Sequence, residues 1–280
     1  MTTKSQSGSQ LQPALREDAG YFEVSGAHLY TVLHRASEPV ARVLLIGPFA
    51  SERQNSYLPW VRWARYLAAR GFDVLRYDHR GVGESLGQFE NATFSNWADD
   101  LTLLSDWFKK LEPEMPLLLH GLEIGALLAC GAFNQSIGDA LLLWSPPTDA
   151  NQALRSALLR WVGLEQLLKP GAERKSAADD IRQLERGLSI EVEGYQWSAR
   201  LWQESLAWKL PSVLGNEGSE AQERPVKIVK LPKEAAPLVK GGFVGYDEVK
   251  DFDWLFSENI KWIQEQFANR GSMSRDASRH

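Results

Sequence analysis

The sequence predicts an α/β fold, with a mostly parallel sheet covered by helices on both faces. Four short apolar segments alternate with amphipathic segments along residues 43–144. Strands of a parallel sheet are apolar throughout, whereas helices that cover a sheet repeat apolar residues every three or four positions. A glycine-flanked turn, Gly121 to Gly125, joins an apolar strand to an apolar helix. A long stretch of helical pattern, residues 148–210, is inserted between two strands.

Length and charge limit the size of the domain and the kinds of partner that this chain can have. The 280 residues suffice for one large domain with an insertion. The chain has 31 Lys and Arg, 36 Asp and Glu, a net charge of −5 and no long basic stretch, so we expect no nucleic-acid partner. Cys130 is the only cysteine, which excludes a disulfide framework and is consistent with a reducing compartment.

Both ends of the chain have the composition of unstructured segments. Residues 1–18 and 269–280 are polar and rich in small residues, and we expect them to be disordered. The first twenty residues lack the apolar core of a signal peptide. No apolar run approaches the ~20 residues that a membrane span requires. We therefore expect a cytoplasmic protein with no membrane span.

A hairpin precedes the parallel strands. Residues 21–24 and 28–34 are rich in aromatic and branched residues and flank a Ser-Gly turn, as the strands of a β-hairpin do. His28 and His34 alternate with apolar neighbours on the second strand. We expect both histidines to face solvent.

Apolar periodicity predicts the remaining elements. Continuous apolar runs predict buried strands at residues 43–46, 74–77, 116–119 and 140–144. Helical spacing predicts helices at Leu58–Arg70, after Gly125 and at Glu258–Phe267. It also predicts a helix that is capped by Ser95 and buries Trp97, Leu101, Leu104 and Phe108. Further strands are expected at Val226–Leu231, near the sheet edge, and at Gly242–Tyr246. The core is then residues 19–147 and 211–268, with residues 148–210 as a helical cap.

The loops that follow these strands resemble those of the α/β-hydrolase superfamily. They are Gly47-Pro48-Phe49, the motif Asp78-x-Arg80-Gly81-x-Gly83-x-Ser85, and the turn at residues 121–125. The Asp-x-Arg-Gly-x-Gly-x-Ser motif matches the superfamily at every fixed position. The resemblance implies an α/β-hydrolase fold with a cap after Trp144. It places position 123 at the nucleophile elbow, the tight strand-to-helix turn that normally carries serine.

A closer resemblance concerns four short segments. They are similar to the second of two hydrolase-like proteins associated with the exosortase export system of exopolysaccharide-producing bacteria. The segments are residues 47–52, 121–128, 142–146 and 192–195. This resemblance implies a bacterial export setting, with a protein partner in that system, rather than a particular reaction.

The residues needed for serine chemistry are absent from their usual places. The residue at the elbow is Glu123. The catalytic histidine of the superfamily follows the last strand, at about residues 247–256 here, and this stretch contains no histidine. Beyond position 120 the only histidine is His280. Nucleophile and base, the two groups that perform the chemistry, are therefore missing.

Glu123 has two interpretations. It can act as a carboxylate nucleophile or as a general base, as the elbow aspartate of dehalogenases and epoxide hydrolases acts as nucleophile. Its extra methylene, however, moves the reactive oxygen by about 1.5 Å, and a displacement near 1 Å can cost on the order of 100-fold in rate. Alternatively, the carboxylate occupies the oxyanion hole formed by the backbone N–H groups of Ile124 and of Phe49 or Ala50. Those donors favour the charged form, and Arg53 or Arg80 would complete a charge pair. We favour this second interpretation.

Other polar residues near the predicted cleft have structural explanations. We expect His120, at the end of a buried strand, to be packed and hydrogen-bonded. Asp78 and Arg80 shape their loop, and His79 is expected at the surface, near the mouth of the cleft. No metal-ligand spacing and no phosphate-binding glycine loop appears, so we expect no metal and no cofactor.

The sequence supports two functions. The first is a hydrolase-fold protein without the serine triad, which binds a small molecule or a protein partner in an accessory role. The second is an unconventional hydrolase of small ester, thioester or acyl substrates that uses Glu123. Fold alone decides neither function.

Overall fold

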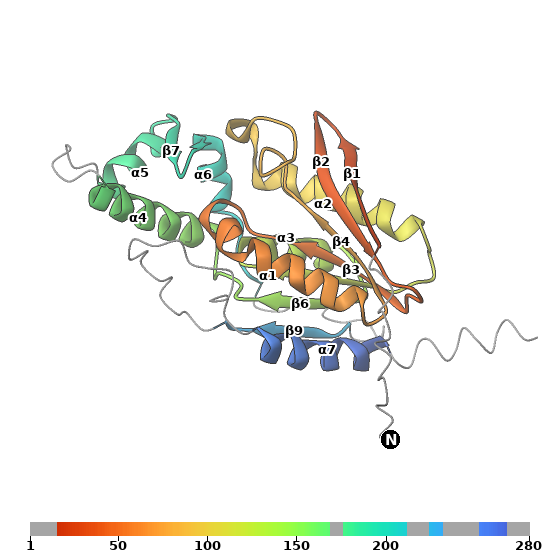
Figure 1. The fold of residues 1–280 in the computed structure, drawn as a ribbon. Coiled ribbons are helices and arrows are strands. Elements are labelled where there is room, and N and C mark those ends of the chain that lie inside the picture. The colour runs from red at the N-terminus through yellow and green to blue at the C-terminus, as the bar shows by residue number, and fades with distance from the viewer. Residues whose placement is uncertain (1–15, 169–175, 212–223, 232–251, 268–280) are drawn as a thin grey trace, which may run out of the picture.

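A seven-stranded sheet forms the centre of the described molecule (Figure 1). The computed structural model describes residues 16–168, 176–211, 224–231 and 252–267. The strand order is β1-β2-β4-β3-β5-β6-β9, in which β1 and β2 are antiparallel to their neighbours and the others are parallel. The strands are β1 (Arg16–Val24), β2 (Ala27–Arg35), β3 (Ala41–Ile46), β4 (Phe72–Tyr77), β5 (Leu117–Leu122), β6 (Ala140–Trp144) and β9 (Val226–Val229). The predicted α/β class is confirmed.

Helices cover both faces of the sheet and divide the core into two layers. The helices are α1 (Ala50–Ala68), η1 (Phe89–Asn91), α2 (Phe94–Lys110), α3 (Ile124–Asn134), α4 (Ala150–Leu168), α5 (Ala177–Glu185), α6 (Ala199–Ser205) and α7 (Asp253–Phe267). Helices α1 and α7 pack on one face, and α2 and α3 on the other. Along β5, Leu118 faces α1 whereas Leu119 faces α3, because successive strand side chains point to opposite faces.

The predicted starts of α1 and α2 were wrong. Helix α1 begins at Ala50 rather than Leu58 and contains Pro59 in its interior. Its first turns, Ser51 to Ser56, are polar, so apolar periodicity appears only later in the segment. Helix α2 is capped by Thr93, whose hydroxyl accepts a 3.1 Å hydrogen bond from the Asn96 N–H, and not by Ser95.

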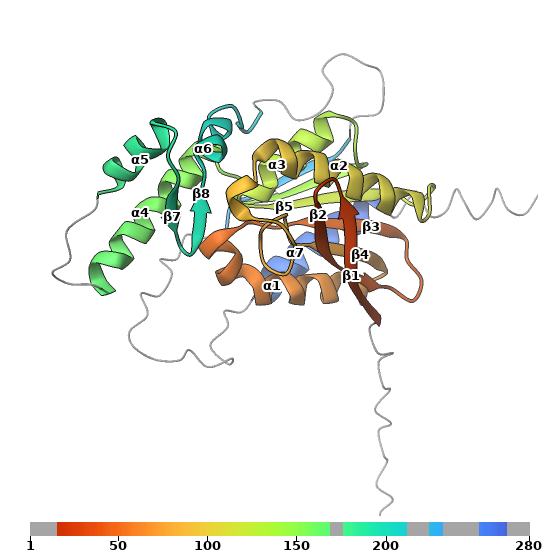
Figure 2. The same cartoon turned by 90° about the horizontal axis from the view of Figure 1, so that it is seen from above.

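The segment at residues 148–210 is mostly helical but also contains a short hairpin. Strands β7 (Ile190–Val192) and β8 (Tyr195–Trp197) pair antiparallel. Glu193 and Gly194 both have positive φ, 53° and 79°, as the two-residue turn of a tight hairpin requires. Figures 1 and 2 place α4, α5 and this hairpin to one side of the sheet.

Several expectations concern the ends of the described segments. Residues 16–18, expected to be disordered, belong to β1, where Asp18 pairs with Arg16 and Arg35. Helix α7 begins at Asp253, before the predicted Glu258. The proposed strand at 242–246, residues 247–251, and both predicted tails except residues 16–18 lie outside the described residues. None of the helices that the structure describes has the length and apolarity needed to cross a membrane.

Candidate functional site

Glu123 occupies a strained turn between β5 and α3. Its backbone has φ 52° and ψ −123°, a conformation that residues with a side chain rarely adopt. Its N–H donates to the Trp144 carbonyl at 3.0 Å, and its carbonyl accepts from the Ala126 N–H at 2.9 Å. The strand, turn and helix therefore form the sharp elbow that the sequence predicts.

The elbow requires glycine on both sides of Glu123. A Cβ atom on Gly121 would collide with the backbone of Ala126. A Cβ atom on Gly125 would collide with the carbonyl oxygens of Ile46 and Gly47, at the end of β3. Both glycines therefore allow close backbone approach. The contact of Gly125 also brings the start of α3 against the loop that precedes α1.

The backbone groups predicted for an oxyanion hole lie at the starts of two helices. Phe49 precedes α1, Ala50 is its first residue, and Ile124 begins α3. All three are buried, and Ala50 has a positive φ of 55°. The Glu123 side chain makes no capping hydrogen bond to α3.

The two cations considered as partners of Glu123 pair with other carboxylates. The Arg53 guanidinium donates to both carboxylate oxygens of Asp78, at 2.9 and 2.8 Å. Arg80 donates to Asp100 on α2, with Nε 2.7 Å from Oδ2, and this hydrogen bond raises the pKa of Arg80. Both guanidinium groups therefore engage carboxylates other than Glu123, and the pairing of Glu123 with Arg53 or Arg80 stays a prediction.

The Asp78 motif shapes its loop as expected. Asp78 accepts from the Glu84 N–H at 3.0 Å, and the Ser85 hydroxyl donates to the Asp78 carbonyl at 2.6 Å. Gly81 and Gly83 have φ of 72° and 58°. These bonds and left-handed conformations fold the loop tightly against the end of β4.

His79 is buried, contrary to the prediction of a surface histidine. Its Nε2 atom donates to the Gly47 carbonyl at 2.8 Å, and its ring packs between Tyr77 and Trp97. Burial lowers its pKa, so the imidazole is neutral. The sequence did not reveal this because the loop turns beneath α2, an element distant along the chain.

His120 is packed and hydrogen-bonded, as predicted. Its Nδ1 accepts from the Trp63 indole N–H at 3.1 Å, and its ring contacts Trp60 and Trp144. Complete burial holds its pKa well below the usual value. Its side chain lies on the α1 side of β5, whereas α3 covers the other side.

Aromatic side chains of residues 148–210 pack over the loop before α1. Phe49 contacts Trp197 of β8 and Trp97 of α2, with ring centroids 6.1 and 5.4 Å apart. Tyr195 packs on Phe89 at 4.7 Å. Trp197 and Trp202 are almost fully buried. These rings are therefore part of the apolar core.

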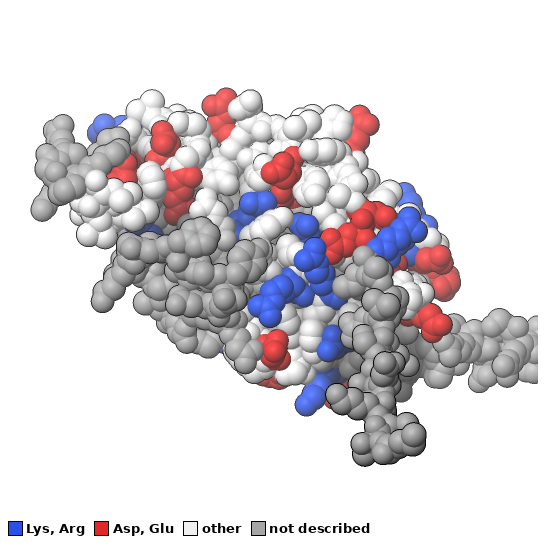
Figure 3. Space-filling view, viewed as in Figure 1, with Lys and Arg blue, Asp and Glu red and all other residues white. Residues whose placement is uncertain are grey.

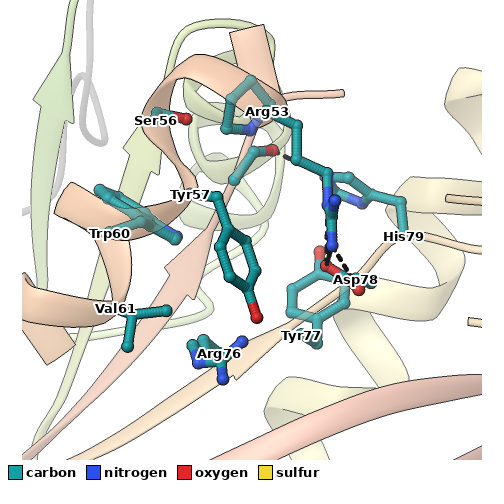
Figure 4. A pocket seen from close by; sticks show the side chains of 11 residues that line it. Arg53, Ser56, Tyr57, Trp60, Val61, Arg76, Tyr77, Asp78 and His79 are labelled. Atoms are coloured by element: carbon teal, nitrogen blue, oxygen red, sulfur yellow. Dashed lines mark hydrogen bonds and ion pairs between the residues drawn. The ribbon is translucent and has the colours of Figure 1, made fainter. Parts of the chain in front are cut away.

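A pocket lies between α1 and β4, beside the elbow (Figure 4). Five residues were expected near the cleft, and three of them, Arg53, Asp78 and His79, line this pocket. Arg80, His120 and Glu123 do not line it. The sequence did not indicate the other side chains that line the pocket, among them Tyr57 and Arg76. The available signal was the charge of Arg76 within an otherwise apolar strand. Within the described ranges, no three His, Cys, Asp or Glu side chains gather as metal ligands.

Comparisons with known proteins agree with this architecture. Residues 57–185 match the family described as serine aminopeptidase, S33. The α/β hydrolase GrgF from Penicillium sp. sh18 is 18% identical with a TM-score of 0.55, over 91% of this chain and 100% of that chain. Est1E from Butyrivibrio proteoclasticus, solved with ferulic acid bound, is 18% identical with a TM-score of 0.56, over 89% and 100%. No curated protein matches the sequence. The chain therefore has an α/β-hydrolase fold.

Proposed function

We propose that this protein uses the α/β-hydrolase fold for binding, in an accessory role, and does not carry out serine-triad chemistry. The observation that carries the proposal is Glu123 at the elbow with φ 52°. The backbone of a nucleophile position is present, but the side chain is not the usual nucleophile.

The histidines support the same conclusion. Ester hydrolysis through a serine or a carboxylate needs a base to activate the attacking group or water. His79 donates to Gly47, and His120 accepts from Trp63 on the other face of the sheet. Residues 247–256, where the superfamily places its base, contain no histidine.

The setting that we propose is bacterial exopolysaccharide export, in the cytoplasm, with a small-molecule ligand or a protein of the export system as partner. Its support is the resemblance of residues 47–52, 121–128, 142–146 and 192–195 to the exosortase-associated group. In the fold, the first two segments form the elbow and the loop facing it, and the last forms the β7–β8 turn.

An unconventional hydrolase that uses Glu123 is the alternative. One observation favours it: Glu123 keeps a strained backbone, and such strain is concentrated at functional sites. The substrate would be a small ester, thioester or acyl compound, with Glu123 as nucleophile or general base.

Activity measurements distinguish the two functions. We expect no burst and no turnover with short-chain nitrophenyl esters, and no labelling by fluorophosphonate probes. Turnover that is lost in Glu123→Gln would establish the hydrolase instead. Stoichiometric labelling of a serine would indicate a triad at another place in the chain.

A further inference from the structure

The pocket between α1 and β4 has two cationic side chains and aromatic walls. Arg53, Tyr57 and Trp60 reach it from α1, and Arg76 reaches it from β4 (Figure 4). Lys and Arg side chains also gather over α1 on the face shown in Figure 3. This face therefore attracts anions even though the whole chain carries a net charge of −5.

The two cations of the pocket differ in how their charge is balanced. Arg53 forms a bidentate ion pair with Asp78. Arg76 forms no ion pair with any carboxylate in the part of the chain that the structure describes. Its hydrogen-bond partner is His34, whose Nε2 accepts from the Arg76 Nε at 3.2 Å.

His34 is buried, which corrects the expectation that it faces solvent. It is fully inaccessible, because β2 lies between β1 and β4 and is contacted by α1, whereas His28 is exposed as predicted. Burial lowers its pKa to about 4, so the ring is neutral near pH 7. Neither His34 nor a carboxylate of the described residues therefore balances the charge of Arg76.

A chain of hydrogen bonds through His34 and Glu17 orients Arg76. The Nδ1 atom of neutral His34 donates to Glu17 at 3.1 Å, and Glu17 accepts from Arg65 of α1 at 2.6 Å. Nε2 is then the unprotonated nitrogen that accepts from Arg76. This chain of hydrogen bonds uses only Nε of Arg76. The two terminal NH₂ groups then present a planar pair of donors to the pocket, and this geometry suits a carboxylate or a phosphate.

Tyr57 supplies a second polar group beside this pair of donors. Its ring lies between the two guanidinium groups, with the Arg53 and Arg76 Cζ atoms 5.2 and 5.7 Å from the ring centroid. Its hydroxyl is directed toward Arg76 (Figure 4). A hydroxyl at this position can donate to an anion held by Arg76, while the ring keeps the guanidinium in place.

We propose that this pocket binds a small organic anion, whose carboxylate or phosphate group is held by Arg76 and Tyr57 and whose apolar part lies against Trp60. This inference does not rest on the proposed function, since neither Glu123 nor any group of the elbow lines the pocket.

Titration of the full chain at constant ionic strength tests the proposal. The probes are benzoate, inorganic phosphate and phenyl phosphate, with benzamide as the uncharged analogue of benzoate. We expect saturable binding of at least one anion and at least tenfold weaker binding of benzamide. Benzoate alone indicates a carboxylate ligand, and phosphate or phenyl phosphate alone indicates a phosphate ligand. Absence of saturable binding for all three anions would overturn the proposal.

Substitutions of Arg76 and Tyr57 test whether the anion binds in this pocket. Arg76→Gln should weaken anion binding at least tenfold, Arg76→Lys should give intermediate loss because the charge remains but the planar pair of donors is gone, and Tyr57→Phe should weaken binding several-fold. Arg62→Gln is the matched control, because Arg62 is an exposed residue of α1 that does not line the pocket. Equal affinity in wild type and Arg76→Gln would overturn the assignment.

Indole NMR keeps the test decisive if Arg76→Gln does not fold. The Trp60 indole signal of the wild type should shift on adding the anion, and the signal of Trp254, which lies half-exposed on α7, should not. Binding that leaves Trp60 unshifted would contradict the proposal. Glu123→Gln should bind the anion as tightly as wild type, so the outcome at this pocket is separate from that at the elbow.

Discussion

Trp63 donates its indole N–H to Nδ1 of His120 at 3.1 Å, and both side chains are completely inaccessible to solvent. This bond joins α1 to the strand that ends at the elbow. Within the described part of the chain, the other ring nitrogen of His120 has no hydrogen-bond partner. His120 therefore depends on Trp63 for its polar contact in an otherwise aromatic layer.

The first prediction is that Trp63 and His120 are energetically coupled. Trp63→Phe leaves a buried acceptor without a donor, and His120→Leu leaves a buried donor without an acceptor, so each should cost about 1–3 kcal/mol beyond its packing loss. The double variant should destabilise the protein by at least about 1 kcal/mol less than the sum. Urea unfolding measures this. Strict additivity, as expected for Trp63→Phe combined with Leu101→Ala on the opposite face, would contradict the coupling.

The second prediction concerns Glu123. A carboxylate at the start of α3 is favoured by the helix dipole, so Glu123→Gln and Glu123→Ser should each lose about 0.5–2 kcal/mol of stability. Glutamine and serine at this position bear the same backbone strain as glutamate. The difference in stability from wild type therefore measures the contribution of the carboxylate. Neither variant should become an esterase, because serine without a base remains protonated.

The sign of the change in stability caused by Glu123→Gln distinguishes the two functions. Urea unfolding at neutral pH compares wild type with Glu123→Gln. A variant more stable than wild type would favour a catalytic carboxylate, since removing a catalytic residue often stabilises a protein.

The third prediction concerns Gly81. Its φ is 72°, and a Cβ atom there would lie 2.8 Å from Cα of Phe89. Gly81→Val should destabilise the protein by more than about 1 kcal/mol, because backbone and not a flexible side chain must move. Gly20→Val is the control: Gly20 lies in the edge strand β1, with open space around it and no positive φ. Equal melting temperatures for the two variants would show that the loop is not constrained.

The fourth prediction is that stability falls with acid because of His34. Its pKa is about 4 in the folded chain and near 6.5 when unfolded, so between these values the unfolded chain binds more protons. The free energy of unfolding should therefore decrease from pH 7 to pH 5, with roughly 2 kcal/mol from His34. Buried His79 and His120, whose pKa values are also lowered, add to the decrease.

Urea unfolding at pH 7, 6 and 5 checks this dependence. His34→Gln should show a smaller decrease over the same interval, since glutamine does not titrate. The contribution of Glu17, whose pKa is lowered chiefly by its hydrogen bond to Arg65, is lost only at lower pH. An identical slope in wild type and His34→Gln would show that the pKa of His34 is not lowered in the folded chain.

Local features of the site were predictable from sequence, and features built by distant segments were not. Gly121 and Gly125 identify the elbow because a tight strand-to-helix turn needs glycine within a few residues of its centre. His34 gave no comparable signal, and the charge of Arg76 within an apolar strand did not identify its partner. Their contact depends on β2 lying beside β4, although the two residues are 42 positions apart. His79 was misplaced for the same reason, since its burial depends on Trp97 of α2.

The geometry of the elbow is set by Gly121 and Gly125, whose neighbours leave no room for a side chain, and not by the residue between them. Shape and reactivity are therefore specified by different positions. A lineage that exchanges the residue at 123 changes the chemistry of the turn without rebuilding its backbone. A change between glutamate and serine is then a substitution at one position within an intact frame.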